Sequence, residues 1–268
     1  MVSRVLKNSI FLRIYAGLIV WVVVVASFCY LLVQIINYQR AQEYRESLTD
    51  GISYVISEGV ARQPQKQQKL DWISDASDLL ELPIFYVDAN RVELSRTEKK
   101  RIAEQKSVVR YDANKGIGYM IIGLRGDTEH FLYIKVDKIG ERQMKALPIF
   151  VLDYLIFYPG QEREYLEKIK KHFYYPIDIS DIKDINLDSE QIGRLRQDQS
   201  VLLYRDSASI RGTTISIVSP MPNHPAQVLV LGPVPMFNWM PFQLSAGITL
   251  FSLFLLSLGV YGLILPLE

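Results

Sequence analysis

PIFYVDANRVELSRTEKKRIAEQKSVVRY (residues 83–111) and PIDISDIKDINLDSEQIGRLRQDQSVLLY (residues 176–204) align without a gap at an offset of 93 residues. Each stretch begins with Pro-Ile at the start of a strand-like run and ends in an apolar segment. Self-similarity at a fixed offset indicates a repeated structural unit. The sequence therefore predicts two copies of one fold, repeat 1 over residues 64–140 and repeat 2 over residues 161–235.

The local chemistry of the two copies agrees. Ser95 with Glu98, and Asp188 with Gln191, have the spacing of a capping box at the start of a short helix. Alternating apolar and polar residues then predict three strands in each copy, near 108–111, 119–124 and 131–136 and near 201–204, 213–218 and 227–231. The predicted fold class is mixed α/β: two tandem PAS-like repeats with antiparallel sheets, flanked by two transmembrane helices.

The two flanking segments are apolar runs. Residues 14–36 and residues 242–264 each extend for 23 residues without a charge. At about 1.5 Å per residue, each helix spans about 34 Å, enough to cross a bilayer core. We expect the first run to be an uncleaved anchor; a cleaved signal peptide is the alternative, but the run is longer than a typical signal core.

Charge sets the expected orientation. Arg4, Lys7 and Arg13 precede the first run without an acidic residue, so residues 1–13 and the C-terminus are predicted to be cytoplasmic. Residues 37–241 are then periplasmic in a bacterial inner membrane. This segment holds 27 of the 30 Lys and Arg residues and 28 of the 29 Asp and Glu residues, and its near-neutral charge argues against a nucleic-acid partner.

Two further segments connect these parts. Residues 37–63 have apolar positions at spacings of three and four, which predicts that the first membrane helix continues outward, either packed on its own domain or as a dimer helix. Residues 141–160 contain a short apolar run, which we interpret as a buried connector between the repeats, with a re-entrant segment as the alternative.

The chemistry-bearing residues are few. The sequence has no zinc-type cysteine pair, since Cys29 is its only cysteine, and no phosphate-binding glycine loop, so we assign no catalytic, cofactor-binding or metal residue. His130 and His224 fall before the last strand of each copy, a place that suits pH sensing or a solvated loop. A crowded acidic stretch suits a ligand or cation surface or a solvated face; its members are Asp178, Asp181, Asp184, Asp188 and Glu190.

The stretch LVLGPVPMFNWMPF (residues 229–242) leads into the second apolar run. Proline fixes φ and donates no hydrogen bond, so we expect the sheet ladder to end here. Residues 236–241 would form a juxtamembrane elbow, with Phe237 and Trp239 at the membrane interface. We therefore predict signal coupling through Gly232, Pro233 and Pro235, and through Pro266 at the start of a linker over residues 265–268.

Residues 176–206, the strand VLVLGPVP (residues 228–235) and the second apolar run resemble the sensory input region of RstB-type sensor histidine kinases, including the BfmS group. The resemblance covers about a third of the chain, and the family pattern has one periplasmic unit where this sequence predicts two. It implies a homodimeric inner-membrane receptor, in contact with membrane lipids and with an unknown periplasmic ligand or protein. A cytoplasmic part outside these 268 residues, beginning with a HAMP linker, would bind ATP and Mg²⁺, autophosphorylate a histidine and pass the phosphate to a response regulator.

Two other function classes fit the same pattern. The chain can be the input region of a chemoreceptor or cyclase, or a membrane-anchored binding or scaffold protein. The coding sequence beyond Glu268 separates these classes, because a histidine kinase continues with an H-E-x-x-x-P block and an ATP-binding region.

Overall fold

The computed structural model describes residues 10–112, 116–136, 141–205, 213–235 and 242–264. It divides into two compact units: a helical unit, Met1–Ala41 with Phe237–Glu268, and an α/β unit, Gln42–Met236. Helix α2 (Ile10–Ala61) is one unbroken helix that belongs to both units. The prediction that the first apolar helix continues beyond residue 36 is therefore confirmed.

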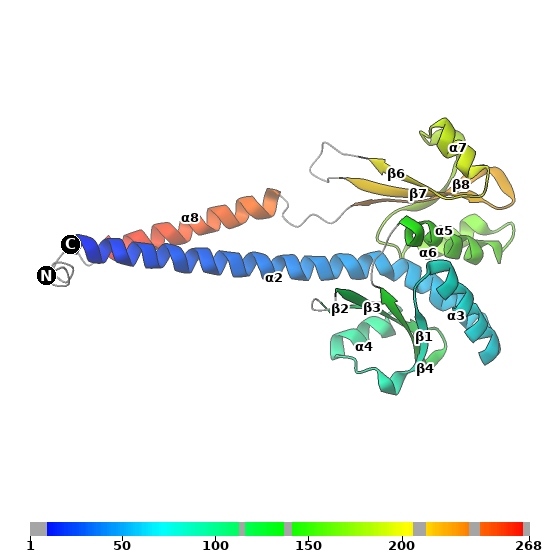
Figure 1. The fold of residues 1–268 in the computed structure, drawn as a ribbon, viewed down its shortest axis with the longest axis horizontal. Helices are drawn as coiled ribbons and strands as arrows, with labels where there is room; N and C mark the ends of the chain where they lie inside the picture. The colour runs from blue at the N-terminus through cyan, green and yellow to red at the C-terminus, as the bar shows by residue number, and fades with distance from the viewer. Residues whose placement is uncertain (1–9, 113–115, 137–140, 206–212, 236–241, 265–268) are drawn as a thin grey trace. The chain divides into compact units, whose positions relative to one another are not determined.

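The α/β unit contains two antiparallel four-stranded sheets, each with its own helices (Figure 1). Sheet 1 has the strand order β1-β4-β3-β2 and sheet 2 the order β5-β8-β7-β6, so their topologies are the same. The elements of repeat 1 are α3 (Lys66–Leu80), β1 (Ile84–Asp88), η1 (Ala89–Arg91), α4 (Arg96–Ala103), β2 (Val108–Asp112), β3 (Ile117–Leu124) and β4 (Asp127–Val136). The elements of repeat 2 are α6 (Glu162–Lys170), β5 (Ile177–Asp181), η2 (Ile182–Asp184), α7 (Ser189–Leu195), β6 (Val201–Arg205), β7 (Thr214–Met221) and β8 (His224–Pro235).

This arrangement confirms a mixed α+β fold with antiparallel sheets. The likeness of each repeat to PAS-type modules stays a prediction. Both capping boxes are formed: Ser95 accepts from the Glu98 N–H, and Asp188 accepts from the Gln191 N–H. The predicted strands are also present, with the last strand of each repeat longer than expected.

The offset between the repeats changes along the chain. The offset is 93 residues between β1 and β5 and between β2 and β6. It is 97 residues between β3 and β7 and between β4 and β8. The cause is the segment before β7, residues 206–213, which is four residues longer than residues 113–116 before β3. Residues in the last hairpins therefore correspond at a different spacing from the one that the sequence alignment used.

One continuous hydrophobic core joins both sheets to the helices. On α2 it includes Ile56 and Val60, and on α5 (Glu141–Ile156) it includes Val151 and Leu155, all with exposed fractions of 1% or less. Inward residues of both sheets, such as Leu132 of β4 and Leu229 of β8, complete it. The two repeats are therefore halves of one folded unit. The segment predicted as a connector, residues 141–160, contributes α5 and with it much of this core.

The opposite face of each sheet carries the short capped helix. On sheet 2, Leu195 of α7 packs with Val201, Val218 and Val228 in a second, smaller cluster. On sheet 1, Gly123 of β3 lies under Ile102 of α4, where a Cβ atom would approach the Ile102 side chain to 2.6 Å. Each sheet is therefore covered on both faces, which explains why its strands are more apolar than strict alternation would require.

In the helical unit, α8 (Phe242–Ile264) lies beside the first part of α2. The Trp21 indole N–H donates to the Leu255 carbonyl over 3.0 Å, and Cys29 Sγ lies 3.0 Å from Ser252 Oγ. A Cβ atom at Gly259 would lie 1.9 Å from the Trp21 Nε1 atom, so only glycine fits there. Small residues allow such close helix contact.

Among the described residues, one helix has the length and apolar composition to cross a membrane, namely α2 over Ala16–Ala61. α8 forms over the residues predicted as the second span, with a shorter apolar stretch over Ala246–Gly259. A second crossing and the orientation of the termini stay predictions.

Candidate functional site

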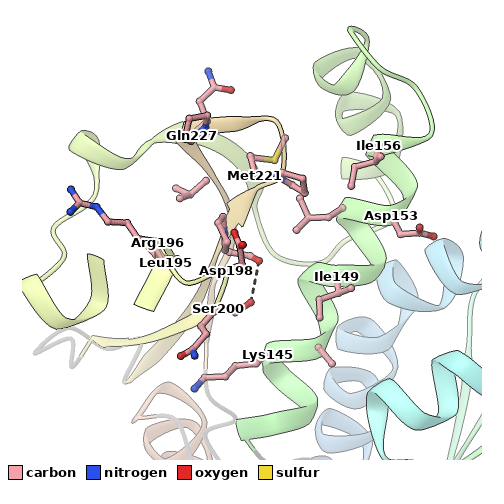
Figure 2. Close-up of a pocket in the computed structure, with 18 of the residues that line it drawn as sticks. Lys145, Ile149, Asp153, Ile156, Leu195, Arg196, Asp198, Ser200, Met221 and Gln227 are labelled. Atoms are coloured by element: carbon pink, nitrogen blue, oxygen red, sulfur yellow. Dashed lines mark hydrogen bonds between the residues drawn. The ribbon is translucent and has the colours of Figure 1, made fainter. Parts of the chain in front are cut away.

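The main candidate site is a groove in the α/β unit between α5 and repeat 2, with a volume of about 1180 Å³ (Figure 2). We call it the α5 groove. One wall is α5, with Lys145, Ile149 and Ile156, and the other wall is formed by residues 195–200 and by the β7–β8 turn. Its size exceeds the usual range of small-molecule pockets, so a ligand would occupy part of it.

The α5 wall is apolar along most of its length. Ile149 and Ile156, spaced by two helical turns, remain 42% and 44% exposed although the opposite face of α5 is buried. Met221 of β7 closes the groove from the sheet side. Lys145 lies near one end of α5 and extends toward the loop that carries Ser200. The groove therefore combines an apolar wall with charged side chains of both signs, namely Arg142, Lys145, Arg196, Asp153 and Asp198, with Lys145 near one end.

The other wall is the loop between α7 and β6. Asp198 has φ = 56°, and the matching residue of repeat 1, Gln105, has φ = 59°. A left-handed residue at the same place gives both loops the same course. In repeat 2 the loop leads to Ser200, whose hydroxyl donates to Ser219 Oγ over 3.1 Å at the edge of the groove.

In repeat 1 the matching loop is closed against α2 by a buried polar network. Ser107, the counterpart of Ser200, has no exposed surface, and both its N–H and its hydroxyl donate to Asp50 Oδ1, over 3.0 Å and 2.9 Å. Arg101, the counterpart of Arg194, donates to the same carboxylate over 2.9 Å and forms an ion pair with Glu46 over 3.2 Å. The loop of repeat 1 therefore binds a carboxylate, supplied by α2.

A second, smaller pocket of about 190 Å³ lies between α2 and the α6–β5 loop. Its lining includes His172, whose ring stacks on Tyr54 of α2 at 3.7 Å between centroids. Burial in this contact lowers the pKa of His172, and the nearby Lys171 lowers it further. His172 is the histidine in contact with α2, and no motif in the sequence indicated it.

The residues predicted for signal coupling lie within β8. The prediction that the prolines end the ladder is wrong, because Val234 pairs with Ile215 and Pro235 with Thr214. Gly232 and Pro233 instead lie at a β-bulge-like shift in the register between β7 and β8. The ladder can omit a hydrogen bond at such a shift and then continue.

Two contacts hold this part of β8 in place. The Gly232 N–H donates to the Pro176 carbonyl over 2.7 Å, and the Tyr44 hydroxyl of α2 donates to the Pro235 carbonyl over 2.5 Å. The same contact in repeat 1 joins the Lys135 N–H to the Pro83 carbonyl, over 3.1 Å. Phe237, Trp239 and Pro266 lie outside the described residues.

The two predicted histidines are not equivalent, contrary to the sequence alignment. His130 of β4 pairs with Asp88 of β1, whereas His224 is the first residue of β8 and pairs with Met221. The counterpart of His130 is Gln227, because Gln227 pairs with Asp181, the counterpart of Asp88. The four-residue difference in the preceding loops produced the apparent match. His130 stacks on Tyr86 at 4.4 Å and bonds to Asp127, so it is part of a structural cluster.

The acidic stretch of repeat 2 does not converge on one point. Asp188 caps α7, Glu190 pairs with Arg194, and Asp178 accepts from the Ile179 N–H. Asp181 and Asp184 lie at the two ends of η2. Within the described part of the chain, no three His, Cys, Asp or Glu side chains are grouped to hold a metal ion.

The sequence did contain a signal for the polar network. Arg101 and Arg194, and Ser107 and Ser200, are identical residues at one offset in the repeats. What the alignment lacked was Asp50, because it lies on α2 outside the repeat. Comparisons with family models, curated proteins and solved structures found no match to this chain.

Proposed function

We propose that this chain is the sensory input region of an inner-membrane, RstB-type sensor histidine kinase. In this proposal the α/β unit is periplasmic, α2 and α8 both cross the membrane, and the chain works as a homodimer. A stimulus acting on the α/β unit changes α8, and a cytoplasmic kinase part then phosphorylates a response regulator. ATP and Mg²⁺ belong to that kinase part.

The observation that carries the proposal is the continuity of α2. This one helix begins in an apolar segment suited to a membrane and ends in the hydrophobic core shared by both sheets. A change in how the sheets pack therefore acts on a helix that also belongs to the helical unit. A binding protein that only needs an anchor does not require its anchor helix to be part of its core.

The position of β8 supports the same proposal. This central strand pairs with both β5 and β7, and α8 follows it after residues 236–241. Its last residue is held by Tyr44 of α2. Strand β8 thus has contacts with the sheet and with α2 just before the chain reaches α8, which suits a coupling element between two states.

The test is a fusion of residues 1–268 to the HAMP and kinase parts encoded downstream or, if these are absent, to those of an RstB-type kinase. Autophosphorylation is measured in nanodiscs for the wild type and for the double variant Pro233→Ala/Pro235→Ala. We expect a change of at least about threefold in the basal rate, with thermal unfolding shifted by no more than a few degrees. Pro159→Ala, which is exposed in the turn between α5 and α6 and lies outside the groove, is the matched control and should leave the rate unchanged.

An unchanged rate in the double variant would contradict the coupling role. A coding sequence that ends shortly after Glu268, or that continues into a chemoreceptor or cyclase domain, would replace the kinase with one of the two other function classes.

A further inference from the structure

The α5 groove has an internal reference, because the loop of repeat 1 that matches the α7–β6 loop of repeat 2 binds a carboxylate. In repeat 1, a loop N–H, a serine hydroxyl and an arginine all donate to one carboxylate, that of Asp50. Repeat 2 keeps the serine as Ser200 and the arginine as Arg194 at the same offset. Both copies thus have the serine and the arginine, although in repeat 2 only Ser200 lines the groove.

The helix that faces the loop is different in repeat 2. Helix α2 precedes repeat 1, and helix α5 precedes repeat 2. Each helix has a fully buried pair of residues one helical turn apart: Ile56 and Val60 on α2, and Val151 and Leu155 on α5. Aligning these pairs places Lys145 where α2 carries Asp50. The chain's own carboxylate is therefore replaced by a cation, and no hydrogen bond joins the Ser200 N–H to any residue in the described part of the chain.

Lys145 and Arg194 each form an ion pair within their own helix, with the Lys145 side chain 30% exposed and the Arg194 side chain 46% exposed. Lys145 pairs with Glu141 over 2.6 Å and Arg194 pairs with Glu190 over 2.5 Å, each between residues four apart. Such pairs contribute little free energy, so either cation can turn toward a ligand at low cost. The carboxylate partners differ more: Glu141 and Glu190 are 60% and 74% exposed, whereas Asp50 of repeat 1 is 16% exposed.

The rest of the groove selects the remainder of the ligand. From Lys145 the groove continues along the apolar residues Ile149, Leu152 and Ile156 of α5. The helix rises by about 10 Å from Ile149 to Ile156. Met221 faces it from β7. A short unbranched acyl chain fits this line, with its carboxylate at the Ser200 end.

We propose that the α5 groove binds an amphiphilic carboxylate, whose carboxylate accepts from the Ser200 N–H and pairs with Lys145 while its acyl chain lies along α5. The bound carboxylate takes the role that Asp50 has in repeat 1 and closes the α7–β6 loop against α5. This inference deepens the proposed sensor function and rests on it for its biological meaning. Binding itself can be measured independently of any signalling output.

The test uses octanoate as the probe and the full chain in lipid nanodiscs, with empty nanodiscs as the blank, in isothermal titration calorimetry. We expect saturable binding with one site per chain. Octanamide, which has the same chain without the charge, and butyrate, which lacks most of the chain, should each bind at least about tenfold more weakly.

Two charge-reversal variants make the location testable. Lys145→Glu should weaken octanoate binding at least about tenfold, because it places a carboxylate beside the bound one. Lys168→Glu is the matched control, since Lys168 also forms an exposed pair four residues away, with Glu164, but lies outside the groove. It should bind octanoate as the wild type does.

The proposal is overturned by an absence of saturable octanoate binding, by equal affinity for octanamide, or by unchanged affinity in Lys145→Glu. These outcomes leave the sensor function in place, since that proposal depends on the kinase rate of the proline variants. Binding as predicted, together with an unaltered kinase rate in those variants, would instead contradict the sensor function alone.

Discussion

The two repeats have the same topology but use the same two side chains in different ways. Arg101 and Ser107 of repeat 1 bind the half-buried Asp50 carboxylate of α2, whereas Arg194 of repeat 2 faces solvent with Glu190 and Ser200 lies at the edge of the α5 groove. One copy of the loop is fixed to α2, and the other is left facing an accessible groove.

The difference shows that two repeats with one topology can hold the same loop with different firmness. Repeat 1 is joined to α2 through half-buried charged groups whose separation would leave them without a partner, so its loop is held more firmly than that of repeat 2. Repeat 2 keeps the same loop without that constraint and also contains β8, the strand that precedes α8. In our proposal a ligand therefore acts on repeat 2, the repeat that precedes α8 in the sequence.

The largest expected effect comes from removing the matched arginines one at a time. Arg101→Ala should lower the free energy of unfolding by about 3 kcal/mol, because it leaves the Asp50 and Glu46 carboxylates half-buried without their cation. Arg194→Ala should lower it by less than about 0.5 kcal/mol, because its pair is exposed. Denaturant unfolding of the full chain in detergent measures both, and equal costs would remove the distinction between the two loops.

The next effect concerns Gly232 of β8, where the matching residue of repeat 1 is Lys135. Gly232 has φ = 113°, and a Cβ atom there would lie 2.7 Å from the Ile215 carbonyl oxygen. Gly232→Ala should therefore cost about 2 kcal/mol, measured by the same unfolding experiment. Gly193→Ala in α7 has open space around its Cβ atom and should instead stabilise by about 0.5 kcal/mol. A neutral Gly232→Ala variant would show that this part of β8 adapts freely.

A smaller effect separates the two capping boxes by pH. The Arg110 guanidinium, together with the helix cap, lowers the pKa of Glu98 to about 2, whereas repeat 2 has Gln191 in the box and Leu203 in place of Arg110. Because the folded-state pKa lies below the unfolded value of about 4.3, this stabilisation is present above that pH and is lost as the pH falls toward 2.

We expect about 1–2 kcal/mol of acid-dependent stability from this pair after allowing for solvent screening at Arg110. Glu98→Gln should remove it, so that the variant and the wild type converge in unfolding free energy near pH 2 and differ near pH 7. A constant difference between them at all pH values would exclude this cause.

The sequence predicted the fold wherever the physical signal was local. The capping boxes of α4 and α7 and the alternating strands depend on residues a few positions apart, and these predictions were confirmed. The register of the last hairpins was missed because the loop before β7 is longer, which moved His224 away from the counterpart of His130. Counting identical residues cannot detect such an insertion when identities are sparse.

The candidate site was not predictable from the sequence. Asp50 and Lys145 lie on helices outside the aligned stretches, and only the packing of α2 and α5 places them opposite Ser107 and Ser200. The prolines of β8 are evident in the sequence, but the pairing beyond Pro233 depends on an irregular register that composition does not reveal.

Amide hydrogen exchange at Ser107 and Ser200 tests the central claim most directly. The two amides are recorded by NMR on the full chain in nanodiscs, with and without octanoate. The account predicts that Ser107 is strongly protected in both conditions by its hydrogen bond to Asp50, and that Ser200 exchanges at least about tenfold faster until octanoate slows it. Equal protection of the two amides without octanoate, or a Ser200 amide that octanoate does not affect, would contradict it.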